Sequence, residues 1–366
     1  MGKYKLINNV LGWIVFAIAS TVYLMTMEPT ASFWDCGEFI SSAYKLEVGH
    51  PPGAPFFMLT ANLFTQLASD PSTVAKMVNT MSALFSGLTI LFLFWSITHL
   101  ARKIMVKDGE EASLGQMITV MGSGLVGALA YTFSDTFWFS AVEGEVYAYS
   151  SLFTAVVFWL ILKWEAVADK PHADRWIVLI AYLMGLSIGV HLLNLLCIPA
   201  IVLVYYYKKF PNPTMKGTLV ALLASFAIVA LMMYGVVQGL VEVCGYFELL
   251  FVNVLGMPYN SGVFAYVIIV AGVLIWSIWE TMRDEIHPTR MKIAFILSVV
   301  LIGIPFIGSG YVLAVILTAA LSLYLFKSKK VDIKTLNTIL VCLMVVVVGY
   351  SSYALTLIRA TAETPM

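Results

Sequence analysis

Two pairs of carboxylates could carry chemistry in this chain. Asp35 and Glu38 lie in the segment SFWDCGEFI, and Glu143 and Glu145 lie in the segment AVEGEVY. Carboxylates that lie close together raise each other's pKa unless a cation or a hydrogen-bond donor lies between them. Such a cluster suits a general base, a divalent-ion site or a docking point for substrate hydroxyls. For Asp35 and Glu38, the alternative is a solvated loop face without chemistry.

Four further polar residues lie in or beside apolar segments. His191 and Asn194 are three residues apart in GLSIGVHLLNLLCIP, so on a helix they share one face. Polar side chains at membrane depth are costly and tend to face a cavity, although a packed, hydrogen-bonded histidine is the alternative. Lys76 and Arg359 lie at the ends of apolar segments. Each can reach a phosphate at the headgroup level, or can simply extend toward lipid headgroups.

The elements that position these residues are expected to be membrane-spanning helices. Hydrophobic residues make up 60% of the chain and charged residues only 11%, with a mean hydropathy of +0.90, whereas soluble domains are about 25% charged. We predict an all-α polytopic membrane protein with spans near residues 10–27, 77–100, 115–133, 147–163, 176–190, 192–207, 217–238, 263–281, 292–308, 310–326 and 336–357. The two runs beside Gly308-Ser309-Gly310 could instead form one re-entrant element.

The first outer segment, residues 28–75, is expected to carry two short helices. Aromatic side chains would seat the first, residues 34–46, in the membrane interface, and a stiff turn at His50-Pro51-Pro52-Gly53 leads into the second. That second segment, residues 53–68, is short and carries polar residues. If it spanned, the basic residues after the next span would lie outside, against the positive-inside rule. We therefore expect a helix at the outer membrane surface.

The charge distribution singles out the outer face. With the N-terminus in the cytoplasm, 18 of the 21 Lys and Arg residues and 10 of the 21 Asp and Glu residues fall inside, so the faces carry +8 and −8. An excess of Lys and Arg inside is ordinary topology, but an acid surplus outside is not required. The outer face is therefore where we expect chemistry. The net charge of zero argues against a nucleic-acid partner.

Several other patterns have simpler interpretations. The run GSGLVG at residues 122–127 matches G-x-G-x-x-G but lies inside an expected span, so close helix packing explains it better than a nucleotide. The aromatic residues 137–139 are typical of an interfacial belt. The four cysteines lack metal-site spacing. Cys36 and Cys244, on expected outer loops, could pair if their Cα atoms approach within about 7 Å.

The order of these features resembles the GT-C superfamily of polyprenyl-dependent glycosyltransferases, in which an acidic motif follows the first span. The segments SFWDCGEFI, GHPPGAPFF, AVEGEVY and GLSIGVHLLNLL are similar to motifs of a bacterial family, glycosyltransferase family 117, whose animal members act as protein O-mannosyltransferases. The similarity covers residues 10–200, and the later spans match only in topology. Many relatives continue into a large soluble outer domain, whereas we expect residues 1–366 to form a single membrane domain without one.

The resemblance implies that a sugar, mannose in the first instance, moves from a polyprenyl-phosphate donor to a Ser or Thr hydroxyl of an exported protein. Asp35 is then the general base of an inverting displacement, with Glu38 as a second catalytic residue. The residues implied in substrate binding are His50, Lys76, Glu143, Glu145, His191, Asn194 and Arg359. A divalent cation, Mg²⁺ or Mn²⁺, could be held by Asp35, Glu38, Glu143 and Glu145, although this superfamily includes metal-independent enzymes.

The resemblance also implies a location, the bacterial inner membrane, with the N-terminus in the cytoplasm and the active site on the periplasmic face of the bilayer. Two alternatives stay open. One is transfer of a preassembled glycan from a polyprenyl diphosphate, or glycosylation of a lipid or polysaccharide. The other is a secondary transporter that uses the carboxylates as proton or cation sites. Transporters place ionisable groups near the bilayer midplane, often between repeats, whereas these acids lie in outer loops and no repeat is visible.

Overall fold

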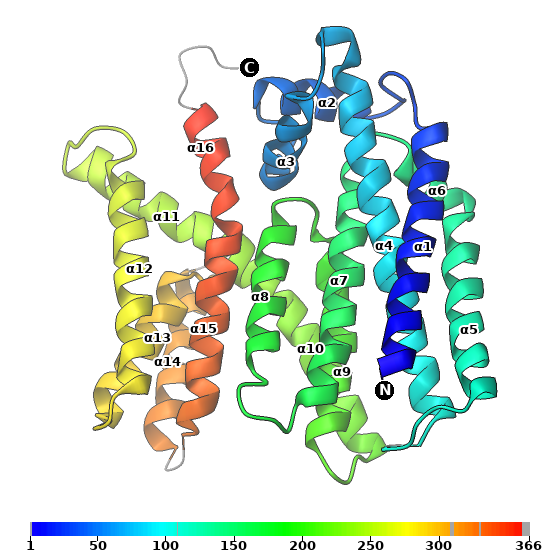
Figure 1. The fold of residues 1–366 in the computed structure, drawn as a ribbon. Helices are drawn as coiled ribbons and strands as arrows, with labels where there is room; N and C mark the ends of the chain where they lie inside the picture. The colour runs from blue at the N-terminus through cyan, green and yellow to red at the C-terminus, as the bar shows by residue number, and fades with distance from the viewer. Residues whose placement is uncertain (1, 108, 308–310, 329–330, 361–366) are drawn as a thin grey trace. The chain divides into compact units, whose positions relative to one another are not determined.

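Every regular element that the structure describes is a helix (Figure 1). The computed structural model describes residues 2–107, 109–307, 311–328 and 331–360. Internal contacts divide the chain into two compact units. The first consists of Met1–Cys197 with Val346–Met366, and the second is Ile198–Val345. The prediction of an all-α protein is confirmed for the described residues.

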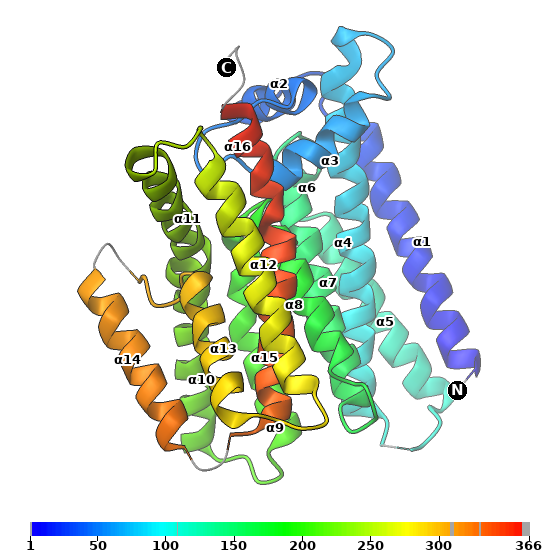
Figure 2. The ribbon, with the colours of Figure 1, turned by 90° about the vertical axis from the view of Figure 1, so that its left-hand side faces the viewer.

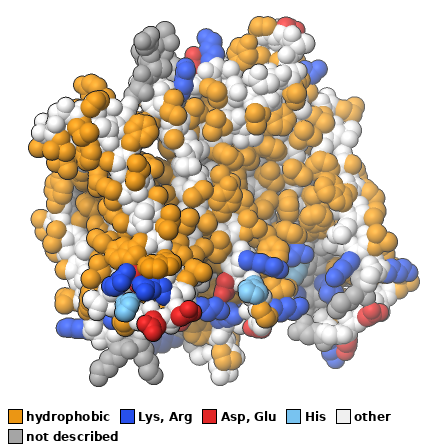
Figure 3. Space-filling model, turned by 60° about the vertical axis from the view of Figure 1, so that its left-hand side comes forward, with side chains coloured by type: hydrophobic (Ala, Val, Ile, Leu, Met, Phe, Trp, Pro, Cys, Tyr) orange, Lys and Arg blue, Asp and Glu red, His pale blue; other side chains and the backbone are white. Residues whose placement is uncertain are grey.

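A helix lies within each of the eleven predicted spans, but only eight helical segments among the described residues are long and apolar enough to cross a membrane. These eight are Gly2–Thr26, Pro71–Met105, Leu114–Thr132, Val146–Val167, Leu192–Lys209, Met215–Val254, Ser261–Met282 and Ile333–Ala360. Helices α8 (Arg175–Ile188), α13 (Pro288–Leu301) and α14 (Tyr311–Lys327) are shorter than the roughly 20 residues that span a bilayer. On the face drawn in Figure 3, hydrophobic side chains cover the middle and charged side chains lie mostly toward the rims, as a membrane protein requires.

Helix α4 (Val74–Met105) lies at the centre of the first unit. The helices that pack against it include α1 (Gly2–Thr26), α5 (Leu114–Thr132) and α7 (Val146–Val167). A Cβ added to Gly124 of α5 would lie 2.5 Å from Thr98 Cγ2, and one added to Gly127 would lie 2.6 Å from Ile97 Cδ1. Glycine at these positions therefore allows α5 to approach α4 closely, and the helix-packing interpretation of the G-x-G-x-x-G run is confirmed.

Short helices gather at one end of the first unit, opposite to the start of α1 (Figures 1 and 2). They are α2 (Cys36–Lys45), α3 (Pro55–Thr65) and α6 (Asp135–Ala141). Helix α2 ends at Leu46, which adopts the left-handed conformation, and α3 begins with Pro55, a residue that suits the first helical turn. Phe39, Phe57 and Met81 belong to one buried core that joins α2 and α3 to α4. Both helices predicted for the first outer segment are thus present.

The second unit contains a helix that is longer than predicted. Its elements are α9 (Ile198–Lys209), α10 (Met215–Ala230), α11 (Gly239–Leu249), α12 (Ser261–Met282), α13, α14 and most of α15 (Ile333–Tyr350). π-helical turns at Leu231–Gln238 and Leu250–Val254 continue α10 and α11, so Met215–Val254 forms one segment of 40 residues. The prediction of an outer loop directly after residue 238 is therefore wrong.

Two acids on this helix are hydrogen-bonded within the second unit. Glu242 accepts a hydrogen bond from the Tyr246 hydroxyl one turn later. The Glu248 carboxylate accepts hydrogen bonds from the backbone N–H groups of Asn260, at 2.6 Å, and Val263, at 3.1 Å, where α12 begins. Both acids are satisfied within the unit rather than displayed in a loop. Gly308-Ser309-Gly310, the predicted break, and Glu363, an expected outer acid, lie outside the described residues.

Candidate active site

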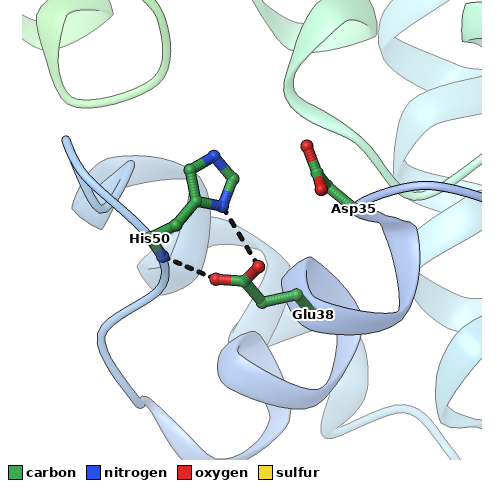
Figure 4. Close-up of side chains that lie close together, drawn as sticks. All are labelled: Asp35, Glu38 and His50. Carbon is green, nitrogen blue, oxygen red and sulfur yellow. Dashed lines mark hydrogen bonds and ion pairs between the residues drawn. The ribbon is translucent and has the colours of Figure 1, made fainter.

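Asp35, Glu38 and His50 come together at the start of α2 (Figure 4). The Glu38 carboxylate accepts a hydrogen bond from the His50 backbone N–H at 2.5 Å and lies 3.1 Å from His50 Nδ1. Hydrogen bonding from His50 holds the pKa of Glu38 below its ordinary value. Asp35 is the N-cap residue of α2, yet its side chain makes no capping hydrogen bond. Its carboxylate therefore lies beside the Glu38–His50 pair without being committed to the helix end.

Cys36, Glu143 and Glu145 form a second, more buried group. One ligand atom from each lies within 4.8 Å of the others, and Glu143 is only 2% exposed. Burial, followed by the charges of Glu143 and Asp35, raises the pKa of Glu145 to about 7. Burial and the neighbouring carboxylates raise the pKa of Cys36 to about 12, so the thiol stays protonated beside Glu143. Both Cys36 and Cys244 are free thiols, so the disulfide alternative is not realised.

The segment between α6 and α7 is tied to the first outer segment by hydrogen bonds. The Glu28 backbone N–H donates to the Val142 carbonyl at 2.9 Å. Asn79 of α4 is fully buried and donates from Nδ2 to the carbonyls of Glu28, at 2.7 Å, and Thr30, at 3.0 Å. A Cβ added to Gly144 would lie 2.9 Å from Asn79 Oδ1. Helix α4 thus holds the two acidic segments together, and only glycine fits between the two glutamates.

His191 lies in a break between α8 and the 3-10 helix Leu192–Cys197. The predicted helical face shared with Asn194 is therefore wrong, because His191 is not in a helix. The Leu193 backbone N–H donates to His191 Nδ1 at 3.1 Å, so the proton of the neutral ring is on Nε2. Burial lowers the pKa of His191 and favours this neutral form. Its ring lies 5.4 Å, centroid to centroid, from that of Tyr147, next to the second acidic group.

The other residues predicted to bind substrate form no hydrogen bond or ion pair with the two acidic groups in the described part of the chain. Asn194 is fully buried and donates to Ser187 Oγ at 3.0 Å, and its Oδ1 has no protein partner. Lys76 is exposed on the first turn of α4, while Arg359 is half-buried on α16 (Ala354–Ala360) with its Nε unpaired. Within the part of the chain that the structure describes, no hydrogen bond or ion pair joins either cation to the two acidic groups. Their role with a phosphate stays a prediction.

A hollow of about 390 Å³ opens beside the second acidic group. Its lining is Asp135, Thr136, Phe139, Ser140, Glu143, Glu145 and Tyr147. The sequence interpretation missed Cys36, Asp135 and Tyr147 as site residues, because none of them has a spacing that indicates chemistry. The aromatic-belt interpretation is wrong for Phe137, which is 4% exposed and stacks on Tyr131 at a centroid distance of 4.4 Å.

Comparison with known proteins supports a resemblance to protein O-mannosyltransferases. Residues 35–214 match the protein O-mannosyl-transferase TMEM260 N-terminal domain. The chain is 28% identical to mouse protein O-mannosyl-transferase TMEM260 over 174 residues, which is 48% of this chain and 22% of that protein. It is 25% identical to the Dictyostelium discoideum protein of the same name over 187 residues, 50% of this chain and 21% of that protein.

The match to TMEM260 contains the two acidic groups. Every predicted site residue except Arg359 lies within residues 35–214. The match spans only about a fifth of the length of either relative. No solved structure matches the chain. The similarity to TMEM260 therefore concerns the segment that builds the site, and the activity of the whole protein is a proposal.

Proposed function

We propose that this protein is a GT-C-type glycosyltransferase that moves a sugar, mannose in the first instance, from a polyprenyl-phosphate donor to a Ser or Thr hydroxyl of an exported protein. Similarity to proteins named protein O-mannosyl-transferase supports sugar transfer to protein. The observation that carries the proposal is that the Asp35 carboxylate makes no helix-capping hydrogen bond and lies beside Glu38 and His50 in the matched segment.

Asp35 is the general base in this proposal. A phosphate leaving group needs little protonation, so the enzyme has to activate the acceptor hydroxyl and stabilise charge on the departing phosphate. Asp35 takes the hydroxyl proton as the acceptor oxygen attacks the anomeric carbon. The bond from that carbon to the phosphate oxygen breaks on the opposite side of the ring, which inverts the anomeric configuration. Lys76 and Arg359 receive the phosphate.

The neighbouring residues position the reactants. Glu38 fixes the turn that carries His50, which leaves Asp35 free to face the acceptor. His191 offers its Nε2–H to a sugar hydroxyl, since its Nδ1 already accepts a hydrogen bond. Asn194 supports this break from inside. The cluster of Asp35, Glu38 and His50 could also hold Mg²⁺ or Mn²⁺, which would supply positive charge near the phosphate.

The arrangement of the acids favours transfer over transport. Both acidic groups lie at one end of the first unit, around the start of α2 and just before α7, rather than midway along a span. Transporters place coupling sites near the bilayer midplane. We further propose that this end of the first unit faces the periplasm of a bacterial cell, where a lipid-linked donor is presented.

Asp35→Asn tests the proposal. The amide keeps the size of the carboxylate but cannot take a proton, so we expect a fall in transfer of about 10²- to 10⁴-fold with unchanged melting temperature. Transfer is measured on the purified protein in lipid nanodiscs with a polyprenyl-phosphate mannose donor and a Ser/Thr peptide, followed by mass spectrometry of the peptide.

The matched control for Asp35→Asn is Glu47→Gln. Glu47 lies on the same outer segment and outside both acidic groups, and its carboxylate forms a 4.0 Å ion pair with the exposed Lys45. We expect this control to keep the wild-type rate. Near-wild-type transfer by Asp35→Asn would exclude Asp35 as the base. Sugar on lipid or polysaccharide, but not on protein, would select the alternative acceptor class.

A further inference from the structure

The hollow beside Glu143 and Glu145 is lined by side chains of two kinds. The lining combines the carboxylates of Asp135, Glu143 and Glu145 with the rings of Phe139 and Tyr147, and α6 contributes one of each kind, Asp135 and Phe139. Its volume of about 390 Å³ is near the lower end of the range for small-molecule sites, about 300–1,000 Å³. The hollow is therefore large enough for one or two rings but not for an extended glycan.

The two rings are not needed to fill the protein core. Phe139 is 55% exposed and Tyr147 is 41% exposed. The preceding residues of α6 behave differently, because Phe137 is buried and Trp138 donates from Nε1 to Thr26 Oγ1 at 3.1 Å. Helix α6 thus anchors itself with two aromatic side chains and leaves the third at the mouth of a hollow. Large aromatic rings left exposed beside a concave polar surface are typical of a binding site.

The charges of the lining restrict what can bind. Three carboxylates and no cation line the hollow. A phosphate or diphosphate would be repelled at such short range. A neutral, hydroxyl-rich molecule would be accepted, because its O–H groups can donate to the carboxylates. A pyranose ring has such hydroxyls at its edge and an apolar C–H face that can cover an aromatic ring.

We propose that this hollow is a subsite for one neutral pyranose ring, with Asp135 accepting from its hydroxyls and Phe139 covering its C–H face. The inference rests on the proposed function, which it deepens by naming where the sugar lies and which residues select it. The ring can arrive on the lipid-linked donor or on an acceptor that already carries sugar. In either case the phosphate lies outside the hollow.

Binding of methyl α-D-mannopyranoside, titrated by saturation-transfer NMR on the full chain in lipid nanodiscs, tests the subsite. Phe139→Leu removes the ring but stays apolar, and we expect it to raise the Kd about three- to tenfold. Asp135→Asn keeps the shape but loses the charged acceptor, and we expect a rise of about tenfold. The control is Phe133→Leu, since Phe133 is 49% exposed beside α6 but does not line the hollow.

Two competitors distinguish the sources of the ring. Displacement of the glycoside by polyprenyl-phosphate mannose assigns the subsite to the donor, and displacement by a mannosyl-threonine peptide assigns it to the product. Either result supports the subsite when both variants weaken binding and Phe133→Leu does not. Wild-type Kd values in Phe139→Leu and Asp135→Asn overturn it. Binding of a lysine-rich peptide that depends on Asp135, together with no binding of the glycoside, also overturns the subsite.

The two proposals fail separately. Glycoside binding does not require transfer. If Phe139→Leu and Asp135→Asn raise the Kd as expected but the wild type transfers no sugar, only the proposed function is contradicted. Conversely, active transfer by a protein whose glycoside binding ignores both substitutions counts against the subsite alone.

Discussion

Asp35 and Glu38 are neighbours in one helical turn, yet their surroundings give them different capacities. Glu38 receives two contacts from His50, through the backbone N–H and ring Nδ1, and these lower its pKa. A carboxylate stabilised as an acceptor is a poorer base. Asp35 makes no capping hydrogen bond although it occupies the N-cap position. In the proposed mechanism, these hydrogen bonds make Glu38 the positioning acid and leave Asp35 as the base.

Glu145 leads to a prediction about pH and stability. Its pKa is about 7 in the folded protein, against an ordinary value of 4.5, chiefly because of burial. The unfolded chain releases this proton near pH 4.5, whereas the folded protein keeps it up to about pH 7. Between these pH values the folded state binds more protons than the unfolded state, so its stability falls as the pH rises. Glu145→Gln cannot ionise and escapes this loss. In chelator-treated protein we expect its Tm to exceed that of the wild type at pH 8, with the difference shrinking toward pH 5.

Glu47→Gln is the control for this pH series, because it removes a carboxylate from the same end of the unit outside both groups. Thermal unfolding followed at several pH values between 5 and 8 gives the comparison. A Tm difference between Glu145→Gln and the wild type that does not change with pH would contradict burial as the origin of the raised pKa.

At the scale of elements, Asn79 connects three parts of the chain. From α4 it holds the carbonyls of Glu28 and Thr30, while its own Oδ1 lies against Gly144. These contacts fix the short α6–α7 segment, and with it the two glutamates that flank Gly144. An active site needs its groups held within about 0.5 Å of a productive geometry. The packing around Gly144 is therefore as relevant to function as the acids themselves.

Gly144→Ala tests this packing. The added Cβ would lie 2.9 Å from Asn79 Oδ1 and 3.0 Å from Ile40 Cγ1 and Val78 Cγ1, closer than ordinary carbon contacts. Overpacking of this kind costs about 1–3 kcal/mol. We expect a lower Tm, and a lower kcat/KM at temperatures where the variant is still folded. Gly122→Ala is the control, because nothing lies within 4 Å of its added Cβ, and it should melt like the wild type or slightly higher.

The sequence predicted elements better than it predicted contacts. Apolar runs located the helices because a span needs about 20 apolar residues, and the three-residue spacing of Asp35 and Glu38 placed them together. The continuation of the helix past residue 238 was missed, since Glu242 resembles a loop acid until its partner Tyr246 is seen. The proximity of Cys36 to Glu143 and Glu145 joins distant parts of the chain and has no local pattern in the sequence.

At the scale of the whole molecule, the charged residues and the alternating direction of the spans together predict which end of the first unit faces the cytoplasm. In the first unit α1, α4, α5 and α7 run alternately up and down, so the acidic end and the loop after α7 lie at opposite ends (Figure 1). That loop carries Lys170, whereas Lys45 ends α2 beside the acidic groups. From the positive-inside rule we expect Lys170 in the cytoplasm and the acidic end outside, as proposed above.

Lys45→Cys and Lys170→Cys test this orientation with a membrane-impermeant maleimide. Both lysines are exposed. Of the native cysteines, Cys36 and Cys197 are buried and Cys244 and Cys342 are half-buried, so the parent chain supplies the labelling background. In intact spheroplasts we expect Lys45→Cys to react and Lys170→Cys to react only after permeabilisation. The reverse pattern would put the acidic groups on the cytoplasmic side, where nucleotide sugars are available, and would remove the reason for a lipid-linked donor.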